Sequence, residues 1–319
     1  MLNRRAYLDK NHKLTIKNEP SPEPKEDEIL IKIAANGICG SDIHFYAAGR
    51  LGNFIVNEPY VPGHEASGTV LKIGKNVLNF TLGEKVCIEP GIPCGRCALC
   101  LSGRYNLCGS VVFLSAPPVN GTFCDYITMR ADFTHKIPEY MKLEHAALAE
   151  PAAVAIHAVN RAISVGSIAG KKGLIFGSGT IGLMVLQAFK AMGGGEVTCA
   201  DVIDGKLELA KKLGADCIIN TKRDIVPVKY ADIVFETAGS PVATAQCVPA
   251  AGVGGTIVQV GWPAGNKVEL NIADIIEKEV VYTSVNRYAN AFPAALNFIK
   301  SGKIKVDQMI THTYMLDDI

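Results

Sequence analysis

The feature that most constrains this chain is a short apolar stretch that runs into a glycine-rich turn. Residues 172–176 are strand-like, and the glycines that follow them have the spacing G-x-G-x-x-G. Apolar residues then recur at helical spacing, which predicts a strand, a turn and a helix. In this context the turn and the helix N-terminus are typical of a site that binds the phosphates of a dinucleotide. The residues expected to contact it are Gly177, Gly179, Thr180, Ile181 and Gly182.

An acidic residue supports this interpretation. Asp201 ends the next strand-like run, residues 196–200, and lies 19 residues after Gly182. A carboxylate in this place binds both ribose hydroxyls of an adenosine and repels the 2′-phosphate of NADP, so NAD is the expected cofactor. Lys206, in the next helix, either reaches the same ribose or lies in solvent.

Strand and helix patterns continue to alternate after this motif. Residues 216–219, 232–236 and 255–261 are further apolar strands. Such alternation predicts a parallel, doubly wound sheet. The connection over residues 220–231 is short for a crossover helix and contains a proline, so one helix of the sheet is expected to be reduced to a turn.

The first part of the chain has a different pattern. Residues 13–16, 29–33, 67–74 and 83–88 are short strand-like runs separated by prolines and glycines, which predicts an all-β or barrel-like domain. A chain of 319 residues is also longer than a single core usually supports, so two domains are expected.

Three candidate metal ligands lie in this first part. Cys39 lies in residues 37–44, and His64 and Glu65 lie in residues 63–66; we expect both segments to be loop-like. A thiolate, an imidazole and a carboxylate are ligands that Zn²⁺ accepts, and three protein ligands leave the open position of a catalytic zinc. The alternative is a buried cysteine and a capping histidine that never meet.

A proline marks a further candidate. An Ala-rich helical pattern over residues 142–163 is interrupted at Glu150 and Pro151. Because proline breaks a helix and frees backbone groups, the Glu150 carboxylate can point into a site. It is a candidate partner of the ligands or a ligand that exchanges with water.

A second group of cysteines has the spacing of a structural metal site. Four thiolates can close around a tetrahedral ion and leave no open position. An iron–sulfur cluster is the main alternative, but no proline follows the last cysteine and the segment is polar, which favours zinc. The four residues are Cys94, Cys97, Cys100 and Cys108, and the remaining cysteines are expected to be mostly small core residues: Cys87, Cys124, Cys199, Cys217 and Cys247.

Composition excludes several classes of partner. A net charge of +1 gives no electrostatic reason to expect binding to nucleic acid or to an acidic membrane surface. No apolar run reaches the roughly 18 residues of a membrane span, and no secretory signal is present at the N-terminus. Cysteines at metal-ligand spacings in a chain without a signal favour the reducing cytoplasm.

With these motifs the chain resembles the zinc-containing medium-chain dehydrogenases, and among them the sorbitol (L-iditol, xylitol) dehydrogenases. The resemblance rests on residues 37–44, on residues 49–56 leading into 63–68, and on residues 286–290 before Phe292 and Pro293. It implies a GroES-like β-barrel catalytic domain over residues 1–151, a Rossmann NAD-binding domain over 152–285, and a return to the catalytic domain over 286–319.

The resemblance also implies roles for individual residues. Cys39, His64 and Glu65 would hold the zinc, with Glu150 beside the bound water, while Ser41 and His44 would relay the proton. Phe45 stands where the family often has tyrosine. Three more residues are expected to contact the cofactor: Val260, Val285 and Arg287. The residues expected to contact the substrate are Phe45, Phe54, Glu150, Arg287 and Tyr288.

These features predict a zinc- and NAD-dependent enzyme that interconverts a sugar alcohol and its ketose, with one catalytic and one structural zinc. A proton acceptor would be Ser41 or water oriented by Glu150. Alternatives are another zinc-dependent secondary alcohol or threonine-type dehydrogenase, or an inactive NAD-binding homologue. The family implies a homo-oligomer, a tetramer or a dimer, and the chain is expected to stop short of the family's last helix and strands.

Overall fold

The computed structural model describes residues 1–319 as two compact units. The first unit comprises Met1–Glu150 and Ile310–Ile319, and the second comprises Pro151–Met309. Residues 286–309 therefore group with the second unit, whereas the family resemblance implies a return to the catalytic domain at residue 286. No helix is long and apolar enough to serve as a transmembrane segment.

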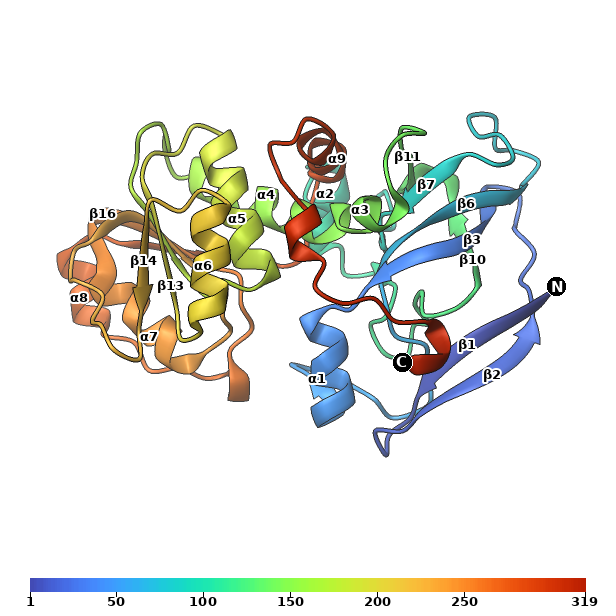
Figure 1. Cartoon of the computed structure of the whole chain (residues 1–319), viewed down its shortest axis with the longest axis horizontal. Helices are drawn as coiled ribbons and strands as arrows, with labels where there is room; N and C mark the ends of the chain where they lie inside the picture. The colour runs from blue at the N-terminus through green and yellow to red at the C-terminus, as the bar shows by residue number, and fades with distance from the viewer. The chain divides into compact units, whose positions relative to one another are not determined.

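The first unit is built on a five-stranded antiparallel sheet with the order β10-β3-β6-β7-β11 (Figure 1). Buried aliphatic side chains from β3 and its neighbours form the core on one side of this sheet, as the alternating pattern of residues 29–33 predicts. The strands of the sheet are β3 (Glu28–Gly37), β6 (Glu65–Ile73), β7 (Lys85–Ile88), β10 (Tyr126–Arg130) and β11 (Thr134–Lys136).

Short hairpins and helices complete the first unit. The hairpin of β1 and β2 joins it through bridges from Arg5 to Cys124 and from Leu8 to Tyr60. The remaining elements are β1 (Leu2–Leu8), β2 (Leu14–Pro20), α1 (Gly40–Ala48), β4 (Arg50–Leu51), β5 (Phe54–Ile55), β8 (Gly91–Ile92), α2 (Ala98–Leu101), η1 (Tyr105–Leu107), β9 (Val112–Phe113), η2 (Ala131–Phe133), α3 (Leu143–Ala147) and η5 (Leu316–Asp318).

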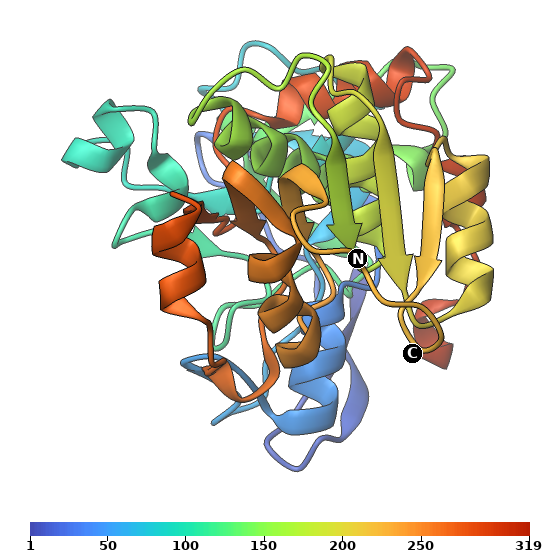
Figure 2. The ribbon, with the colours of Figure 1, turned by 90° about the vertical axis from the view of Figure 1, so that its left-hand side faces the viewer.

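The second unit is built on a six-stranded sheet in which all neighbouring strands are parallel. The strand order is β14-β13-β12-β15-β16-β17, the doubly wound arrangement that the alternating pattern predicts. Figure 2 shows β12, β13 and β14 side by side with their arrows in one direction. The strands are β12 (Gly173–Phe176), β13 (Val197–Asp201), β14 (Cys217–Asn220), β15 (Ala231–Glu236), β16 (Ala251–Gln259) and β17 (Val281–Ser284).

Helices pack on this sheet and bury its apolar side chains. Helices α5 and α6 contact β12 to β14, and α7 contacts β15 and β16. As predicted, no helix connects β14 to β15. The helices are α4 (Ala149–Ile163), which begins at the end of the first unit, α5 (Thr180–Ala191), α6 (Asp204–Lys212), α7 (Pro241–Ala250), η3 (Ala264–Asn266), α8 (Ile272–Glu277), α9 (Phe292–Lys300) and η4 (Asp307–Met309).

Three local expectations need correction. The helical pattern over residues 142–163 does break, but at Leu148, between α3 and α4. Pro151 lies in the first turn of α4, where its missing N–H costs nothing because that group has no partner in the helix anyway. Cys217 is exposed at the start of the edge strand β14, whereas the other four cysteines expected in the core are buried. Of the two segments expected to be loop-like, residues 40–44 are helical after the N-cap Cys39, and Glu65 opens strand β6.

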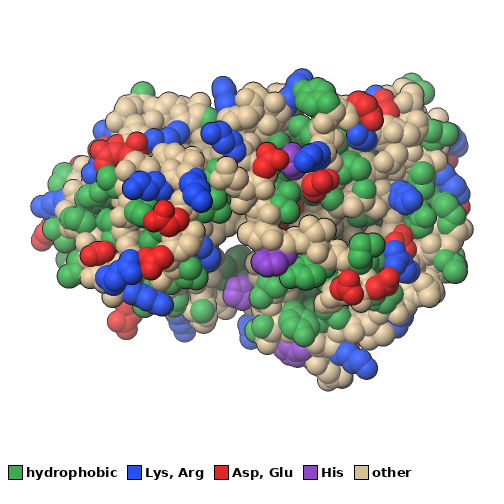
Figure 3. Space-filling model, in the orientation of Figure 1, with side chains coloured by type: hydrophobic (Ala, Val, Ile, Leu, Met, Phe, Trp, Pro, Cys, Tyr) green, Lys and Arg blue, Asp and Glu red, His purple; other side chains and the backbone are tan.

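The surface carries no face of a single charge in the view of Figure 3, where basic and acidic side chains are interspersed. This agrees with the net charge of +1.

A buried lysine links two helices of the second unit. The side chain of Lys278 is only 5% exposed, and its ammonium contacts Asp274 at 3.0 Å. The same Nζ donates to the carbonyl oxygens of Val248 and Pro249 at 3.1 and 3.2 Å, in the last turn of α7. A cation at a helix C-terminus satisfies carbonyls that have no partner in the helix.

We predict that Lys278→Met destabilises the second unit by about 2–3 kcal/mol, because it leaves two carbonyls and a carboxylate without their charged donor. The midpoint of thermal unfolding should fall by about 5–10 °C. Circular dichroism measures it, with the exposed Lys300→Met as the matched control. A shift no larger than that of the control would contradict this role.

Candidate metal centres and cofactor site

Three side chains in the first unit form a possible metal centre. The Cys39 thiol, the His64 imidazole and the Glu65 carboxylate each place a ligand atom within 4.8 Å of the other two. His64 and Glu65 are buried, and His64 Nδ1 has no hydrogen-bond partner. A soft, a borderline and a hard donor around one point fit Zn²⁺ and leave a tetrahedral position open.

Strand register explains why residues so far apart in the sequence meet. In the antiparallel pair of β3 and β6, Gly37 lies opposite Glu65. The chain leaves β3 at this point, so Cys39 follows two residues later beside the start of β6. A Cβ atom at Gly37 would collide with the Glu65 carboxylate. Glycine at this position therefore makes room for that carboxylate.

Asp42 holds the two ligand-bearing segments together. Its side chain is buried and accepts hydrogen bonds from the backbone N–H groups of Cys39 at 3.0 Å and Gly63 at 3.1 Å. The Ser115 hydroxyl donates to the same carboxylate at 3.0 Å. An acid three residues after the N-cap of a helix accepts from the N-cap backbone, which is a recognisable sequence signal for Asp42. Ser115 has no such signal, because it lies far away in the sequence.

The charges around the centre favour a cation. Burial and the carboxylates of Glu65, Asp42 and Glu150 all raise the pKa of the Cys39 thiol. Burial alone would lower the pKa of His64, but the same carboxylates, with Glu150 the largest influence, raise it above its usual value. Several acidic groups converge on this buried space around His64. A divalent ion is the partner that stabilises such an arrangement.

The other expected catalytic residues lie around this centre within the first unit. Glu150 is buried near His64, since its charge acts strongly on that imidazole, but its carboxylate is not among the three close donors. Ser41 lies close to the Cys39 thiol, and its hydroxyl acts to lower the pKa of that thiol. His44 is exposed on α1, three residues further along the same helix.

Aromatic residues of the first unit have different surroundings. Phe45, expected near the substrate, is buried in a core cluster, where its ring meets that of Tyr60 edge-on at 6.0 Å. Phe54 is exposed in strand β5. The ring of Phe113, which sequence reasoning did not single out, lies 5.5 Å from that of His64.

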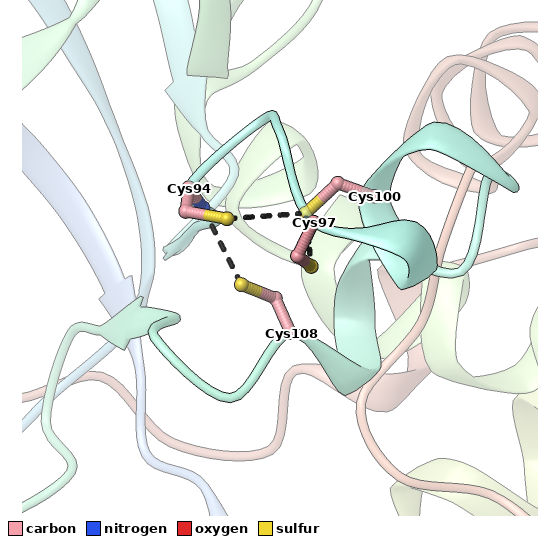
Figure 4. Close-up of side chains that lie close together, drawn as sticks. All are labelled: Cys94, Cys97, Cys100 and Cys108. Atoms are coloured by element: carbon pink, nitrogen blue, oxygen red, sulfur yellow. Dashed lines mark hydrogen bonds between the residues drawn. The ribbon is translucent and has the colours of Figure 1, made fainter.

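The second cysteine group converges on one point of the first unit. Figure 4 shows the four sulfur atoms directed toward a common centre from three short segments. All four lie within 4.8 Å of one another, and the pairs Cys97–Cys100 and Cys94–Cys100 are 3.4 and 3.9 Å apart. Four sulfur donors without an open position suit a structural tetrahedral ion. The residues are Cys94, Cys97, Cys100 and Cys108.

The four thiols do not ionise equally without a cation between them. Backbone N–H donors from Arg96 and Cys97 lower the pKa of Cys94 to about 6, so this sulfur readily becomes the thiolate that binds metal. Burial and the hydrogen bond with Cys97 raise the pKa of Cys100 to about 12. A metal ion between the sulfurs would stabilise the thiolate form of both Cys94 and Cys100. Spacing alone does not assign the ion, but the geometry fits zinc.

The glycine-rich turn lies where the dinucleotide motif requires it. Gly177 follows β12 with φ +93°, a conformation that side chains disfavour, and Ala238 packs closely against it. Gly179 caps α5, and a Cβ atom there would meet only open space. Thr180, Ile181 and Gly182 form the first turn of this 12-residue helix, with open space at Gly179 and close packing of Gly182 against Gly177. Such a terminus attracts phosphate.

Asp201 ends β13 beside this turn. Its carboxylate accepts backbone N–H groups from Ser178 at 2.7 Å, Val202 at 2.7 Å and Ile203 at 3.0 Å. A carboxylate offers about four acceptor positions, so three are occupied and about one remains for a ribose hydroxyl. If Asp201 binds both ribose hydroxyls, as the sequence predicts, one carboxylate lone pair must accept from a hydroxyl and a backbone N–H at the same time. Lys206 is exposed in α6.

The remaining cofactor and substrate candidates lie in the second unit. Val260 and Val285 are half-buried just after β16 and β17, and Val285 N donates to Gln259 O at 2.9 Å. Arg287 has φ +57°, and burial lowers its pKa. Tyr288 is buried, with its ring 6.1 Å from that of Phe292. Their roles remain predictions.

We predict that Asp42→Asn weakens zinc binding at the Cys39 centre about 10- to 100-fold. The side chain of asparagine has an NH₂ group in place of one carboxylate oxygen, so it cannot accept one of the two backbone hydrogen bonds. The ligand-bearing segment that loses this bond would be held less firmly. Titration of zinc-loaded protein with a chelator measures the effect, and the Cys₄ site serves as an internal reference. Asp132→Asn is the control because Asp132 pairs on the surface with Arg130. Equal chelator sensitivity in both variants would refute the role.

Comparison with known proteins agrees with both units. Residues 25–139 match the alcohol dehydrogenase GroES-like domain, and residues 180–301 match the zinc-binding dehydrogenase domain. Sorbitol dehydrogenase from Bacillus subtilis is 40% identical over 321 residues, which covers 98% of this chain and 90% of that protein.

Solved structures give the same result. An Escherichia coli oxidoreductase of unknown specificity has a TM-score of 0.92 at 38% identity, covering 100% of this chain and 93% of that one. A putative zinc-binding dehydrogenase from Sinorhizobium meliloti, bound to NADP, has a TM-score of 0.89 at 28% identity, with coverage of 97% and 91%. On its sequence, its two domains and its donor sets, this chain belongs to the zinc-type medium-chain dehydrogenase family.

Proposed function

We propose that the protein is a zinc- and NAD-dependent polyol dehydrogenase that interconverts a secondary alcohol of a sugar alcohol and the corresponding ketose. The observation that carries the proposal is the group of Cys39, His64 and Glu65, whose three different donor atoms lie within 4.8 Å of one another. Similarity to sorbitol dehydrogenase over 98% of the chain supports the substrate class.

The residues of the first unit have complementary tasks in this proposal. Bound zinc would act as a Lewis acid that makes the alcohol more acidic. Ser41, beside Cys39, and His44, three residues later on the same helix, form a path for the released proton. Glu150 supplies a negative charge near His64 and orients water or substrate there. Asp42 keeps the ligands in position.

The donor set supports a polyhydroxyl substrate. A centre with one carboxylate and one thiolate is harder than a centre with two thiolates, which suits oxygen ligands from two adjacent hydroxyl groups. The second unit supplies the hydride acceptor through its glycine-rich turn. Asp201 lies beside that turn with its carboxylate half-exposed, which favours a free ribose hydroxyl over a phosphate.

The test is an assay of purified, zinc-loaded protein with sorbitol, xylitol and L-iditol. Growth of absorbance at 340 nm on addition of NAD supports the proposal. Cys39→Ala should lower the rate at least 100-fold and leave cofactor binding unchanged, because the residue lies in the other unit. Turnover of threonine or simple secondary alcohols without turnover of polyols would refute the substrate class, and cofactor binding without any turnover would refute the activity.

We predict that Asp201→Ala lowers the ratio of kcat/KM for NAD to kcat/KM for NADP by roughly 10- to 100-fold. The substitution removes the carboxylate that accepts from the ribose hydroxyl of NAD and repels the 2′-phosphate of NADP. The two constants are measured with the best polyol. Asp224→Ala, on the exposed connection after β14, is the control. An unchanged ratio would show that another residue selects the cofactor.

A further inference from the structure

One buried carboxylate in the second unit has no part in the mechanism above. Glu236 is the last residue of β15, and its side chain is completely buried. Its carboxylate accepts the backbone N–H groups of Ala238 at 3.1 Å and Gly239 at 3.3 Å, and the Gln259 side-chain amide at 2.6 Å. No lysine, arginine or histidine pairs with it.

The hydrogen-bond pattern identifies the charge state of Glu236. Every group that contacts the carboxylate is a donor, and a protonated carboxyl would need an acceptor for its own hydrogen. Burial raises the pKa of Glu236 above its usual value, and the backbone and Gln259 donors offset part of that rise by stabilising the ionised form. The arrangement of donors is therefore that of a carboxylate anion whose charge is solvated by neutral dipoles and is not cancelled by a cation.

This charge lies directly below the loops at the carboxyl end of the sheet. A Cβ atom at Gly261, after β16, would lie 2.6 Å from Glu236 Oε2. The next residue, Thr237, donates its hydroxyl to the carbonyl oxygens of Phe176 and Gly177 at 2.9 and 2.8 Å. Glu236 is thus adjacent to the glycine-rich turn on one side and to the loop after β16 on the other.

The strand order indicates which half of a dinucleotide approaches Glu236. The order reverses between β12 and β15, and a dinucleotide binds across such a point. Asp201 marks the β13 side as the adenosine half. The nicotinamide half is therefore expected on the β15 and β16 side, above Glu236. The oxidised nicotinamide ring carries a positive charge, whereas the reduced ring is neutral.

We propose that Glu236 is a specificity-determining residue for the oxidation state of the cofactor: its uncompensated negative charge favours the oxidised, cationic dinucleotide over the reduced one. This inference rests on the proposed use of a nicotinamide cofactor. A charge in a poorly polarisable interior acts over several ångströms, so it need not touch the ring. It would ease release of the reduced product after alcohol oxidation.

The test compares equilibrium dissociation constants of the full, zinc-loaded chain for NAD⁺, NADH and ADP-ribose, measured by calorimetry. Glu236→Gln keeps the shape and removes the charge. We expect it to weaken NAD⁺ binding about five- to tenfold and to change NADH and ADP-ribose binding less than twofold. Gln259→Met is the matched control: it breaks the same network without changing the charge, so it should affect NAD⁺ and NADH equally.

Two results would overturn the inference: an equal change of both affinities in Glu236→Gln, which indicates only a positioning role, or no change in either. If this variant loses ADP-ribose binding through misfolding, Gln259→Lys decides, because the new cation would neutralise Glu236 in place. It should lower the NAD⁺ preference, and an unaltered preference refutes the inference. A wild-type chain that binds no dinucleotide refutes the cofactor assignment itself.

Discussion

The candidate metal centre depends on one buried carboxylate that is not itself a ligand. Asp42 accepts hydrogen bonds from both ligand-bearing segments and from the Ser115 loop. A metal ion tolerates only small errors in ligand position, so the backbone of each segment must be fixed before the ion binds. The pairing of β3 with β6 brings the segments together, and Asp42 fixes their spacing. Burial of the Asp42 charge is tolerated because the neighbouring N–H groups donate hydrogen bonds to the carboxylate.

The two units show the same principle in different forms. In each, an acid near the end of a strand or the start of a helix accepts hydrogen bonds from the backbone N–H groups of a loop that carries function. Asp201 fixes the glycine-rich turn through Ser178, and Glu236 fixes the next turn through Ala238 and Gly239. Backbone groups in loops have no regular partners, so a carboxylate can order several of them together.

Sequence predicted those parts of the site that depend on local spacing. The Cys₄ group, the glycine-rich turn and Asp201 were found because their residues lie within one short segment or one βα unit. The helix that follows Cys39 was not predicted, although Asp42, three residues after the N-cap, is a local signal for it. The burial of Phe45 and the role of Ser115 were not found because they depend on contacts between segments distant in the sequence, which residue patterns do not record. Cys217 looked like a core residue, but its strand lies at the edge of the sheet.

The missing crossover helix between β14 and β15 has a consequence for how the chain can vary. This connection leaves Ile225 91% and Val228 71% exposed, since no helix covers them. Val226 packs against the core, but the other residues of 222–229 are exposed, so an added residue beside Ile225 or Val228 would displace water and not a packed neighbour. The connection is therefore the part of the sheet domain best suited to accept an insertion, such as a peptide tag, while the strands on either side keep their register.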